Sequence, residues 1–542
     1  MVWQQIKIII FLLLPCLLFA GAHYVDSGAS GANDGSSWTD AWESFADITW
    51  EGAGVTAGDT LYISGGADST VYNASLDIQA SGTSGNLIVI MCGTDASHNG
   101  LVVITDNVTI TNEEYVKLYG NTGYDIKIRN VTGDGLTMNY ITGVIAERID
   151  LYYSSDDGIS VDEYDGGDNY IRYCKLHDNY DYNIIVNRPV LDDDAPYADS
   201  SHLFIEYNEI YNMGQDGIHC AAYAGGVCIR YNNIHTQITG DAYHYSGYID
   251  GMQLRGWKHL SVYGNWIHDL WATDGLNAYI FVECDVAVQT NTLAHDIYIF
   301  NNVITETDHT TNPTQNSKGI EFKPRAAGSL RKVLIANNTI VDTRVYGIEM
   351  HDFDNLPSDN IENVVVINNI IYNNDQRTGG SGDRLSFTLH ELQAGVTTGS
   401  LGEEVDIVWD YNLVDALVGT ATCRYGGPGT GVLMDYSAFN AASGCDDHGV
   451  EADPTFTNYS ENGVTAATDL QLDGSDATAR NAGTASTIFT VDYNGVTRPQ
   501  DALWDIGAWE VVSSPPPPAN KAFVPGGVGI LIPAGNGKII TE

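Results

Sequence analysis

Basic residues are scarce in this chain of 542 amino acids. It has 24 Lys plus Arg against 70 Asp plus Glu, and its formal net charge at pH 7 is −46. A surface this acidic repels nucleic acids and anionic membranes, which argues against a role in binding either one. The charge suits a secreted protein or one that collects Ca2+, and plain solubility in a salty medium explains it equally well.

Long apolar runs are confined to the N-terminus. The stretch "IIIFLLLPCLLFA" at 8–20 follows a single Lys and leads into "AGA" at 20–22. This pattern predicts a secretory signal peptide over residues 1–22 and a mature chain that begins near His23. No later stretch predicts a membrane span. The expected location is therefore secreted or at the cell surface, extracellular or periplasmic.

Cysteines are few and lack the spacing of a metal site. There are eight, one of them within the expected signal peptide, and no CxxC motif is present. A zinc site built from thiolates is therefore not expected. Seven remaining cysteines allow up to three disulfides and a spare thiol. We predict a bridge between Cys423 and Cys445, and buried free thiols are the alternative.

Sustained helical periodicity is missing from the middle of the chain, where two short phrases repeat instead. One reads "GDGLTM", "DDGISV", "DGIHC", "IDGMQL", "SKGIEF" and "VYGIEM"; the other reads "IEYNEI", "IRYNNI", "IFNNVI", "IANNTI" and "VINNII". The Asn positions of the second phrase recur at intervals of 24 to 37 residues, at Asn208, Asn232, Asn265, Asn302, Asn338 and Asn369. Short alternating segments rich in Ile, Val and Tyr indicate strands, and the interval indicates a solenoid. We predict an all-β coil in which the Asn side chains stack and hydrogen-bond along the axis.

These repeats resemble those of right-handed parallel β-helix proteins of the pectate-lyase type. The start "HYVDSGASGANDGSSWTDAWESFADI" is similar to the N-terminal cap of such proteins, and "RPQDALWDIGAWE" at 498–510 is similar to their closing segment. The resemblance implies a single-stranded right-handed parallel β-helix with an N-terminal cap and irregular C-terminal coils. The expected divisions are 1–22 signal peptide, 23–55 cap, 56–375 β-helix, 376–512 late coils and closing segment, and 513–542 Pro-rich linker and tail. The fold alone implies no single reaction.

The residue that varies within the first phrase is predicted to point outward, because neighbours in a strand face opposite sides. Stacked coils then align these residues in one row: Thr137, Ser160, Ile185, His219, Gln253, Asn277, Glu321 and Glu349. Asp216, Asp250 and Lys318 border the row on one side, and Arg255, Lys323 and Arg325 border it on the other. We predict a groove for a linear glycan there, with Trp257 among the aromatic residues available for sugar stacking. A solvated polar face is the alternative.

The favoured activity is cleavage of an acidic polysaccharide by β-elimination. That reaction needs a cation for the uronate carboxylate, a base for the adjacent proton, and an acid for the leaving oxygen. Lys318 or Lys323 is the predicted base, Arg325 or Arg255 the predicted cation, and His219 and Glu321 complete the catalytic set. The predicted substrate-binding residues are Gln253, Asp216, Asp250, Arg255, Glu349 and Trp257.

A bound Ca2+ is a further expectation. The acidic stretch "SSDDGISVDEYDGGDN" offers Asp156, Asp157 and Asp162 as oxygen ligands, although it matches no complete EF-hand loop, and solvated acidic turns explain it as well.

Two other functions remain open. A glycoside hydrolase would use paired carboxylates, with Glu321 and Glu349 or Asp216 and Asp250 as the pair. The "NTD", "DD", "GHG" and "RIK" set of the pectin hydrolases that share this fold is incomplete here. A surface adhesin would use the groove for binding alone. His177, His235 and His268 recur at one coil position, which is typical of a structural ladder at a turn.

Overall fold

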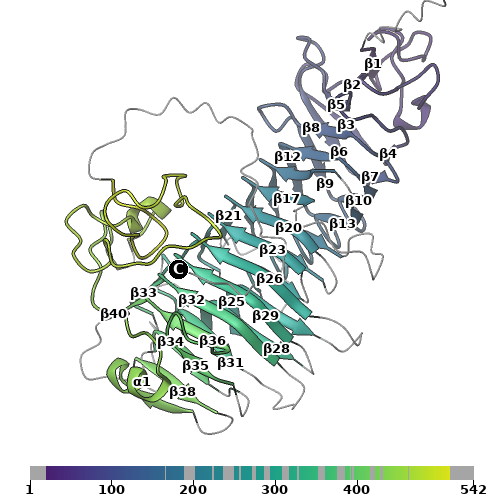
Figure 1. The fold of residues 1–542 in the computed structure, drawn as a ribbon. Coiled ribbons are helices and arrows are strands. Elements are labelled where there is room, and N and C mark those ends of the chain that lie inside the picture. The colour runs from purple at the N-terminus through teal and green to yellow at the C-terminus, as the bar shows by residue number, and fades with distance from the viewer. Residues whose placement is uncertain are drawn as a thin grey trace, which may run out of the picture.

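The computed structural model describes residues 20–164, 167–187, 202–221, 225–235, 249–255, 258–270, 276–285, 293–307, 316–325, 329–351, 360–374, 385–390, 392, 396–415, 422–427, 431–461 and 463–512. The expected signal peptide, apart from its last residues, and the Pro-rich tail lie outside this part of the chain. Three long sheets run side by side along one axis (Figure 1). Each turn of the chain adds one strand to each sheet.

The first sheet, sheet 1, contains β1 (Ala22–Val25), β2 (Thr60–Ile63), β5 (Ile88–Cys92), β8 (Val116–Tyr119), β11 (Ile145–Glu147), β14 (Asn169–Arg172), β17 (Leu203–Glu206), β20 (Gly225–Arg230), β23 (Lys258–Tyr263), β26 (Leu293–Phe300), β29 (Ser329–Ala336), β32 (Asn360–Ile367), β36 (Ile407–Asp410) and β35 (Thr398–Gly399).

The second sheet, sheet 2, contains β4 (Leu76–Ile78), β7 (Val108–Thr111), β10 (Leu136–Ile141), β13 (Ile159–Tyr164), β16 (Ile184–Val186), β19 (Ile218–Cys220), β22 (Met252–Arg255), β25 (Leu276–Asp285), β28 (Asn316–Arg325), β31 (Ile348–His351), β34 (Phe387–His390), β38 (Cys423–Gly426) and β39 (Val432–Met434).

The third sheet, sheet 3, contains β3 (Ser69–Tyr72), β6 (Leu101–Ile104), β9 (Ile126–Arg129), β12 (Ile149–Tyr152), β15 (Lys175–His177), β18 (Glu209–Tyr211), β21 (Asn233–His235), β24 (Trp266–His268), β27 (Val303–Thr305), β30 (Thr339–Val341), β33 (Ile370–Tyr372), β37 (Leu413–Val414) and β40 (Val450–Glu451). Helical segments are short: η1 (Phe45–Asp47), η2 (Ala467–Leu470) and α1 (Tyr436–Ser443).

The chain is a parallel β-helix, as the repeats predicted. Strand pairs in the three sheets are parallel, except that β38 and β39 at one end are antiparallel. Alternate residues point into the coil, so that Ile218 and Cys220 of β19 stack on Met252 and Leu254 of β22, all fully buried. The period of two in the sequence therefore builds one continuous apolar core along the axis. No helix in the described residues is both long enough and apolar enough to span a bilayer.

The predicted asparagine ladder is present at the corner before sheet 3. From Asn208 onward, each ladder Asn donates its Nδ2 to the Oδ1 of the Asn on the next coil, at 2.9–3.0 Å, and the series ends at Asn412. The ladder residues themselves do not take the left-handed conformation. The residue before each one does, for example Tyr207 and Asn301, with φ of 56° and 52°. The ladder Asn thus satisfies backbone groups that the turn leaves open.

The predicted histidine ladder also forms, on the outer face of sheet 3. His177, Tyr211, His235 and His268 occupy equivalent positions on successive strands. Their rings stack in sequence, with centroids 4.4–5.4 Å apart.

The two cysteines expected to form a disulfide do not form one. Cys423, at the start of β38, and Cys445, after α1, are both buried free thiols. The buried-thiol alternative therefore holds for this pair, and burial raises the pKa of each thiol.

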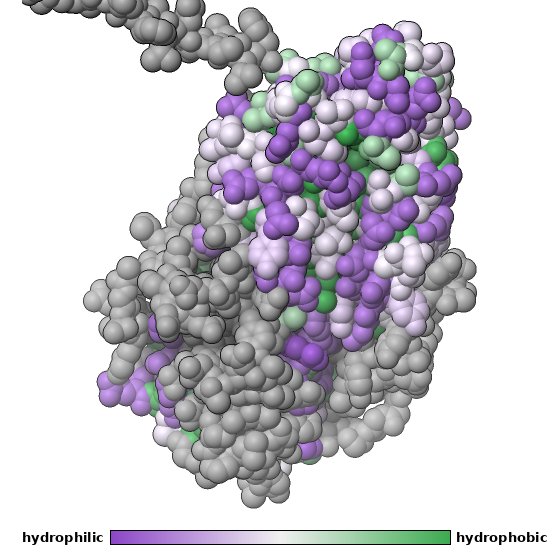
Figure 2. All heavy atoms as spheres, turned by 90° about the vertical axis from the view of Figure 1, so that its right-hand side faces the viewer, coloured by the Kyte–Doolittle hydropathy of each residue, from purple (hydrophilic) through white to green (hydrophobic). Residues whose placement is uncertain are grey.

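The outer faces of sheets 1 and 3 change character halfway along the molecule. On sheet 3, one outward row reads Lys127, Asp150, Lys175, Glu209, Asn233, Trp266, Val303, Thr339, Ile370 and Leu413. On sheet 1, the corresponding row reads Tyr119, Glu147, Arg172, Glu206, Arg230, Tyr263, Phe300, Ala336 and Ile367. Hydrophilic side chains are prominent on the described surface in Figure 2. Beyond β23 and β24 both rows become mainly apolar, with Thr339 in the sheet 3 row and Asp410, which follows Ile367, in the sheet 1 row as the polar members.

Residues 451–512 cover these apolar rows (Figure 1). Phe489 and Trp504 pack on sheet 1 beside Phe300, and Ile506 and Trp509 join the cluster on sheet 3. The side chain of Asn337, at the corner between the two sheets, donates to the carbonyls of Asp505 and Gly507. The end of the chain is therefore part of the folded structure of the late coils.

Candidate functional site

The outward row of sheet 2 keeps polar residues where the rows of the other two sheets turn apolar. Register places Ser160, Ile185, His219, Gln253, Phe281, Glu321, Glu349 and Thr388 at equivalent positions on successive strands. Asn277 was predicted in this row and is not there, because it pairs with Ser317, and Phe281 takes the place. β25 has ten residues and no glycine, so the repeated phrase gave no reference point for aligning it.

His219 and Asp216 form a buried pair at the centre of this row. The imidazole Nδ1 lies 2.9 Å from Asp216 Oδ2, and the two residues are 5% and 1% exposed. The ring of Tyr182 stacks on the imidazole with centroids 4.2 Å apart. Asp216 also accepts the backbone N–H of Asp250 through Oδ1 at 3.0 Å. The carboxylate therefore orients the imidazole and leaves Nε2 for another partner.

Gln253 and Arg255 extend the site on the next strand, β22. With its amide oriented to satisfy its neighbours, Gln253 donates to Asp216 Oδ2 at 3.1 Å, its nitrogen lies 3.0 Å from His219 Nδ1, and its oxygen accepts from Arg255 at 3.0 Å. Arg255 Nε lies 2.9 Å from an oxygen of Glu283, whose side chain is fully buried. The side chain of Arg255 keeps 34% of its surface exposed. It is thus a cation held in place on one side and open on the other.

Lys318 lies further along the row and holds two glutamates. Its Nζ is 2.9 Å from Glu321 Oε1 and contacts Glu349 Oε2. Burial alone would lower the pKa of Lys318, but the carboxylates of Glu349 and Glu321 outweigh it and raise the pKa above its ordinary value. A general base must be neutral to accept a proton. The arrangement therefore makes Lys318 a charged clamp and does not support the base role predicted for it.

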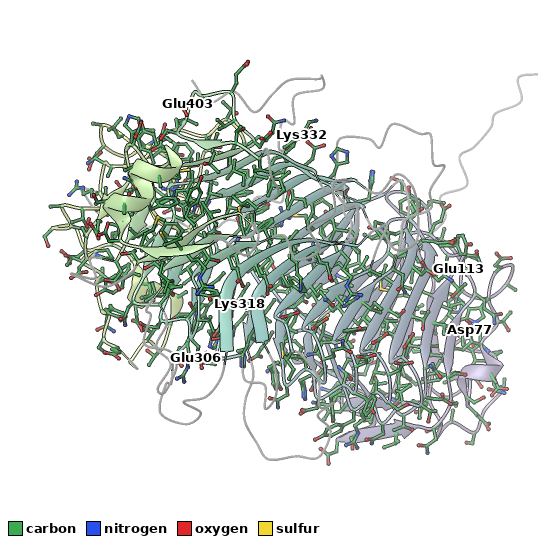
Figure 3. All side chains as sticks on the ribbon, turned by 90° about the horizontal axis from the view of Figure 1, so that it is seen from below. Asp77, Glu113, Glu306, Lys318, Lys332 and Glu403 are labelled. Atoms are coloured by element: carbon green, nitrogen blue, oxygen red, sulfur yellow. The ribbon has the colours of Figure 1, made fainter. Side chains whose placement is uncertain are left out.

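A second buried carboxylate network lies beside Lys318 (Figure 3). The hydroxyl of Tyr279 donates to Glu306 Oε2 at 2.7 Å, and Ser317 donates to the same oxygen at 3.4 Å. Tyr279 belongs to β25, and Ser317 directly precedes Lys318 in β28. This network fixes the two strands that carry Phe281, Lys318 and Glu321.

Asp250 has the most perturbed environment in the site. Burial is the largest cause and the nearby carboxylate of Asp216 the next, and together they raise the pKa of Asp250 well above its ordinary value. The backbone N–H of Ala278 donates to Asp250 Oδ1 at 2.7 Å and opposes this rise. The site thus places a carboxyl group with a raised pKa beside charged groups, which is typical of acid–base catalysis.

The structure gives little information on three other predicted site residues. Lys323 is half-buried and pairs in register with Glu283, one coil away. Arg325 pairs with Asp285 at the end of β28, but its side chain lies outside the described part of the structure. Trp257 lies outside the described residues altogether. None of the three is therefore assigned a contact here.

Three residues near the site were missed by the sequence analysis. Glu283 and Phe281 lie in β25, where the glycine of the repeated phrase is absent. Tyr182 lies in the turn before β16, in "DYNII", where Asn stands in place of that glycine. The repeated glycine phrase could not have located these residues. The spacing of the strands before and after them in the sequence could have done so.

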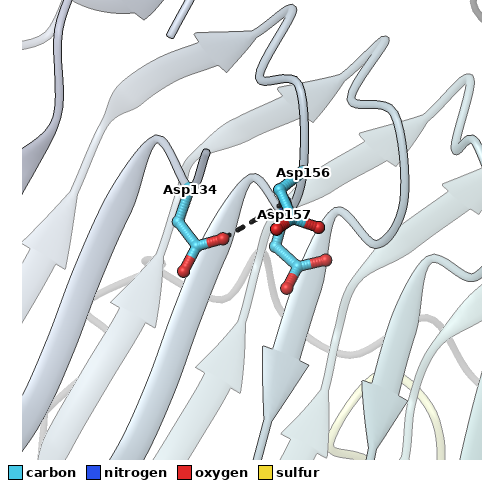
Figure 4. Close-up of side chains that lie close together, drawn as sticks. All are labelled: Asp134, Asp156 and Asp157. Atoms are coloured by element: carbon cyan, nitrogen blue, oxygen red, sulfur yellow. Dashed lines mark hydrogen bonds between the residues drawn. The ribbon is translucent and has the colours of Figure 1, made fainter. Parts of the chain in front are cut away.

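An acidic group on earlier coils matches the predicted metal site in part (Figure 4). Oxygens of Asp134, Asp156 and Asp157 lie within 4.8 Å of one another, and Asp162 is not in the group. Burial and the charges of Asp134 and Asp156 help raise the pKa of Asp157 to about 7. Clustered carboxylate oxygens suit a hard cation such as Ca2+. The Ca2+ site stays a prediction, with Asp134 in the place of Asp162.

No protein-family model matches this chain, and no curated protein matches its sequence. Among solved structures, XylC in complex with xylose is similar over 91% of this chain and 98% of that chain, with 11% identity and a TM-score of 0.43. Pectate lyase Pel9A is similar over 90% and 96%, with 14% identity and a TM-score of 0.38. An alginate lyase from Paenibacillus sp. strain FPU-7 is similar over 61% and 91%, with 13% identity and a TM-score of 0.34. Likenesses this weak carry no conclusion about activity.

Proposed function

We propose that this protein is a carbohydrate-active enzyme that cleaves an acidic polysaccharide by β-elimination on the outer face of sheet 2. The observation that supports it is the buried His219–Asp216 pair, linked through Gln253 to the half-open cation Arg255. Burying so many ionisable groups costs free energy that a purely structural face would avoid. Secretion, expected from the N-terminal segment, would bring the enzyme to extracellular glycans.

Each step of the reaction has a residue suited to it. Arg255 would pair with the uronate carboxylate and so acidify the neighbouring C–H bond. His219 would remove that proton through Nε2, because Asp216 holds Nδ1 and stabilises the imidazolium that forms. The C–O bond to the leaving sugar then breaks and a C=C bond forms. Asp250, whose pKa is raised by burial and by Asp216 and which lies on the coil next to Asp216, is the candidate acid for the leaving oxygen.

Glycoside hydrolysis is the second candidate, and the closeness of Asp216 and Asp250 on adjacent coils is the observation that favours it, since the backbone N–H of Asp250 donates to Asp216 Oδ1 at 3.0 Å. A hydrolase needs one protonated carboxyl group as acid and one ionised carboxylate as base or nucleophile. Asp250 would be the acid and Asp216 the base or nucleophile. Hydrolysis leaves no unsaturated sugar, so the two reactions are distinguished by their products.

The test incubates the purified protein with acidic and neutral polysaccharides, with and without Ca2+. Ultraviolet absorbance reports the unsaturated product, and a separate assay counts new reducing ends. We expect absorbance to rise with an acidic substrate, and we expect His219→Ala to lose it. New reducing ends without absorbance would favour hydrolysis, and no product with any glycan would contradict both proposals.

A matched control separates catalysis from general damage to the protein. His448 also pairs with an aspartate, since its Nδ1 lies 2.9 Å from Asp410 Oδ2, but it lies outside sheet 2 and its side chain is 54% exposed. His448→Ala is therefore expected to retain full activity. Lys323→Met tests the base that the sequence analysis suggested, and we expect it to retain activity in the same assay.

A further inference from the structure

A shallow cleft lies on the early coils, away from sheet 2. It opens on sheet 1 over β5 and β8, the strands labelled in Figure 1, and has a volume of about 410 Å³. Its lining consists of Met91, Gly93, Thr94, Asn99, Tyr119, Asn121, Thr122 and Asp125. None of these residues takes part in the site around His219.

The floor of this cleft is an aromatic and thioether strip. Met91 and Tyr119 are equivalent residues on adjacent strands, and Tyr24 and Tyr62 continue the same row on β1 and β2. All four are half-buried, so each keeps part of its surface open. The Nζ of Lys117 lies 4.2 Å from the ring centroid of Tyr119 and holds that ring in place.

A tryptophan packs beside Gly93 of the lining. A Cβ at Gly93 would lie 2.6 Å from the carbonyl oxygen of His98 and 3.0 Å from the Trp38 ring, so glycine lets both residues approach closely. Trp38 stacks on His98 at a centroid distance of 3.9 Å, and its Nε1 donates to Asp95 at 2.6 Å. The indole is therefore fixed before any ligand binds.

The rim carries uncharged hydrogen-bonding groups and a single carboxylate. Thr94, Asn99 and Thr122 are exposed, and Asn121 is half-buried. Within the described residues, these four side chains make no hydrogen bond to the protein. Asp125 is the only charged residue of the lining. Donors and acceptors are thus available above an apolar floor.

We propose that this cleft binds neutral sugar units of a glycan chain. A pyranose ring offers an apolar C–H face, which suits Met91 and Tyr119, and a hydroxyl edge, which suits Asn99, Asn121 and Asp125. An anionic sugar is disfavoured because Asp125, within the lining, repels it. The inference does not depend on the proposed elimination, since the cleft lies on a different sheet.

The test is electrophoresis of the purified protein through native gels that contain one polysaccharide each. Xylan, a β-glucan and a neutral galactan are the neutral probes, and alginate and pectate are the anionic ones. We expect at least one neutral probe to retard the protein. Tyr119→Ala should weaken that binding about tenfold or more, as loss of a central aromatic contact does. Tyr140→Ala is the matched control, because Tyr140 is 48% exposed and lies outside the cleft.

Three outcomes would overturn the inference. The first is the absence of retardation by every neutral probe. The second is equal retardation of the Tyr119→Ala variant and the wild-type protein. The third is retardation by anionic probes alone, strengthened in Asp125→Asn, because removal of the negative charge should not help a neutral ligand. An unchanged melting temperature in each variant shows that the fold is intact.

Discussion

The early and late coils share one core but differ on their outer surfaces. On the early coils, sheet 1 carries a half-exposed charge ladder, in which Glu147 binds Lys117 at 3.0 Å and Arg172 at 2.8 Å. On the late coils the same row continues as Phe300, Ala336 and Ile367, beneath residues of the C-terminal segment. The inner faces require only that every second residue be apolar. The residues of the outer faces differ according to whether solvent or the C-terminal segment covers them.

The outward row of sheet 2 stays polar on the late coils, where the rows of sheets 1 and 3 become apolar. The candidate site lies in this polar row. On the late coils its outward row still carries charged residues, although Glu321 and Glu349 are only 6% and 4% exposed. Apolar residues would cover the same strands at lower cost, since buried charges lose their hydration. The comparison therefore supports the proposal that the charges of sheet 2 serve a reaction.

The largest effect is expected from detaching the C-terminal segment. Arg498 is fully buried and binds Glu510 at 2.9 Å, with a further contact to Asn301 of the coil at 3.2 Å. Arg498→Ala leaves a buried carboxylate without its cation, so we expect a loss of about 3–5 kcal/mol in unfolding free energy. Urea denaturation followed by fluorescence measures it. Arg480→Ala, which breaks the exposed pair with Asp501, is the control and should cost far less.

The asparagine ladder offers the next test. Asn338 donates to Asn369 Oδ1 and to the carbonyl of Ile299, and it accepts from Asn302. Asn338→Ala leaves several buried groups without partners, so we expect a loss on the order of 3 kcal/mol. On the coil before Asn208, Cys174 occupies the ladder position, and its backbone N–H donates to Asn208 Oδ1 at 2.9 Å. A loss below about 1 kcal/mol, no larger than that of the exposed control Asn86→Ala, would show that the ladder does not stabilise the late coils.

A pH-dependent effect is expected on the early coils. The pKa of Asp157 is about 7, against an ordinary value of 3.8, so the folded protein holds a proton that the unfolded chain has lost. Its stabilising effect is complete below pH 3.8 and is lost as the pH rises through about 7. Asp157→Asn should therefore raise the unfolding free energy at alkaline pH by on the order of 1 kcal/mol, and the melting temperature with it. In acid the variant should match the wild-type protein. Ca2+ should raise it in the wild-type protein and not in the variant.

The smallest effect is expected from the early charge ladder. Lys117→Met removes one half-exposed partner of Glu147, while Arg172 remains, so we expect a change below about 1 kcal/mol. If Lys117→Met lost as much unfolding free energy as Arg498→Ala, the early and late coils would not differ in how far their outer-face ion pairs stabilise the fold. The melting temperature at low and high salt measures it, and the difference should shrink as salt screens the pair.

The sequence predicted the repeating parts of the fold better than the particular parts of the site. Alternation and the recurring Asn gave the coil, the ladder and most of the sheet 2 row, because each is enforced at every turn. The sequence analysis placed Asn277 where Phe281 stands. The repeated glycine was the reference point for aligning the strands, and β25 has none. That analysis also chose Asp162 over Asp134, because residues one coil apart are far apart in the chain.

The charge state of Lys318 lay beyond the reach of the sequence for another reason. Its pKa depends on whether Glu321 and Glu349 both point at Nζ, and only the packed side chains decide that. The same holds for Cys423 and Cys445, for which we predicted a bridge that the structure does not contain.

The most direct test of the account is the mass of the products that the protein releases from an acidic polysaccharide. Elimination yields fragments lighter by one water than those of hydrolysis. We predict that the wild-type protein and His448→Ala release these lighter fragments and that His219→Ala does not. Fragments with the mass of hydrolysis products, or release of the lighter ones by His219→Ala at the wild-type rate, would contradict the proposal.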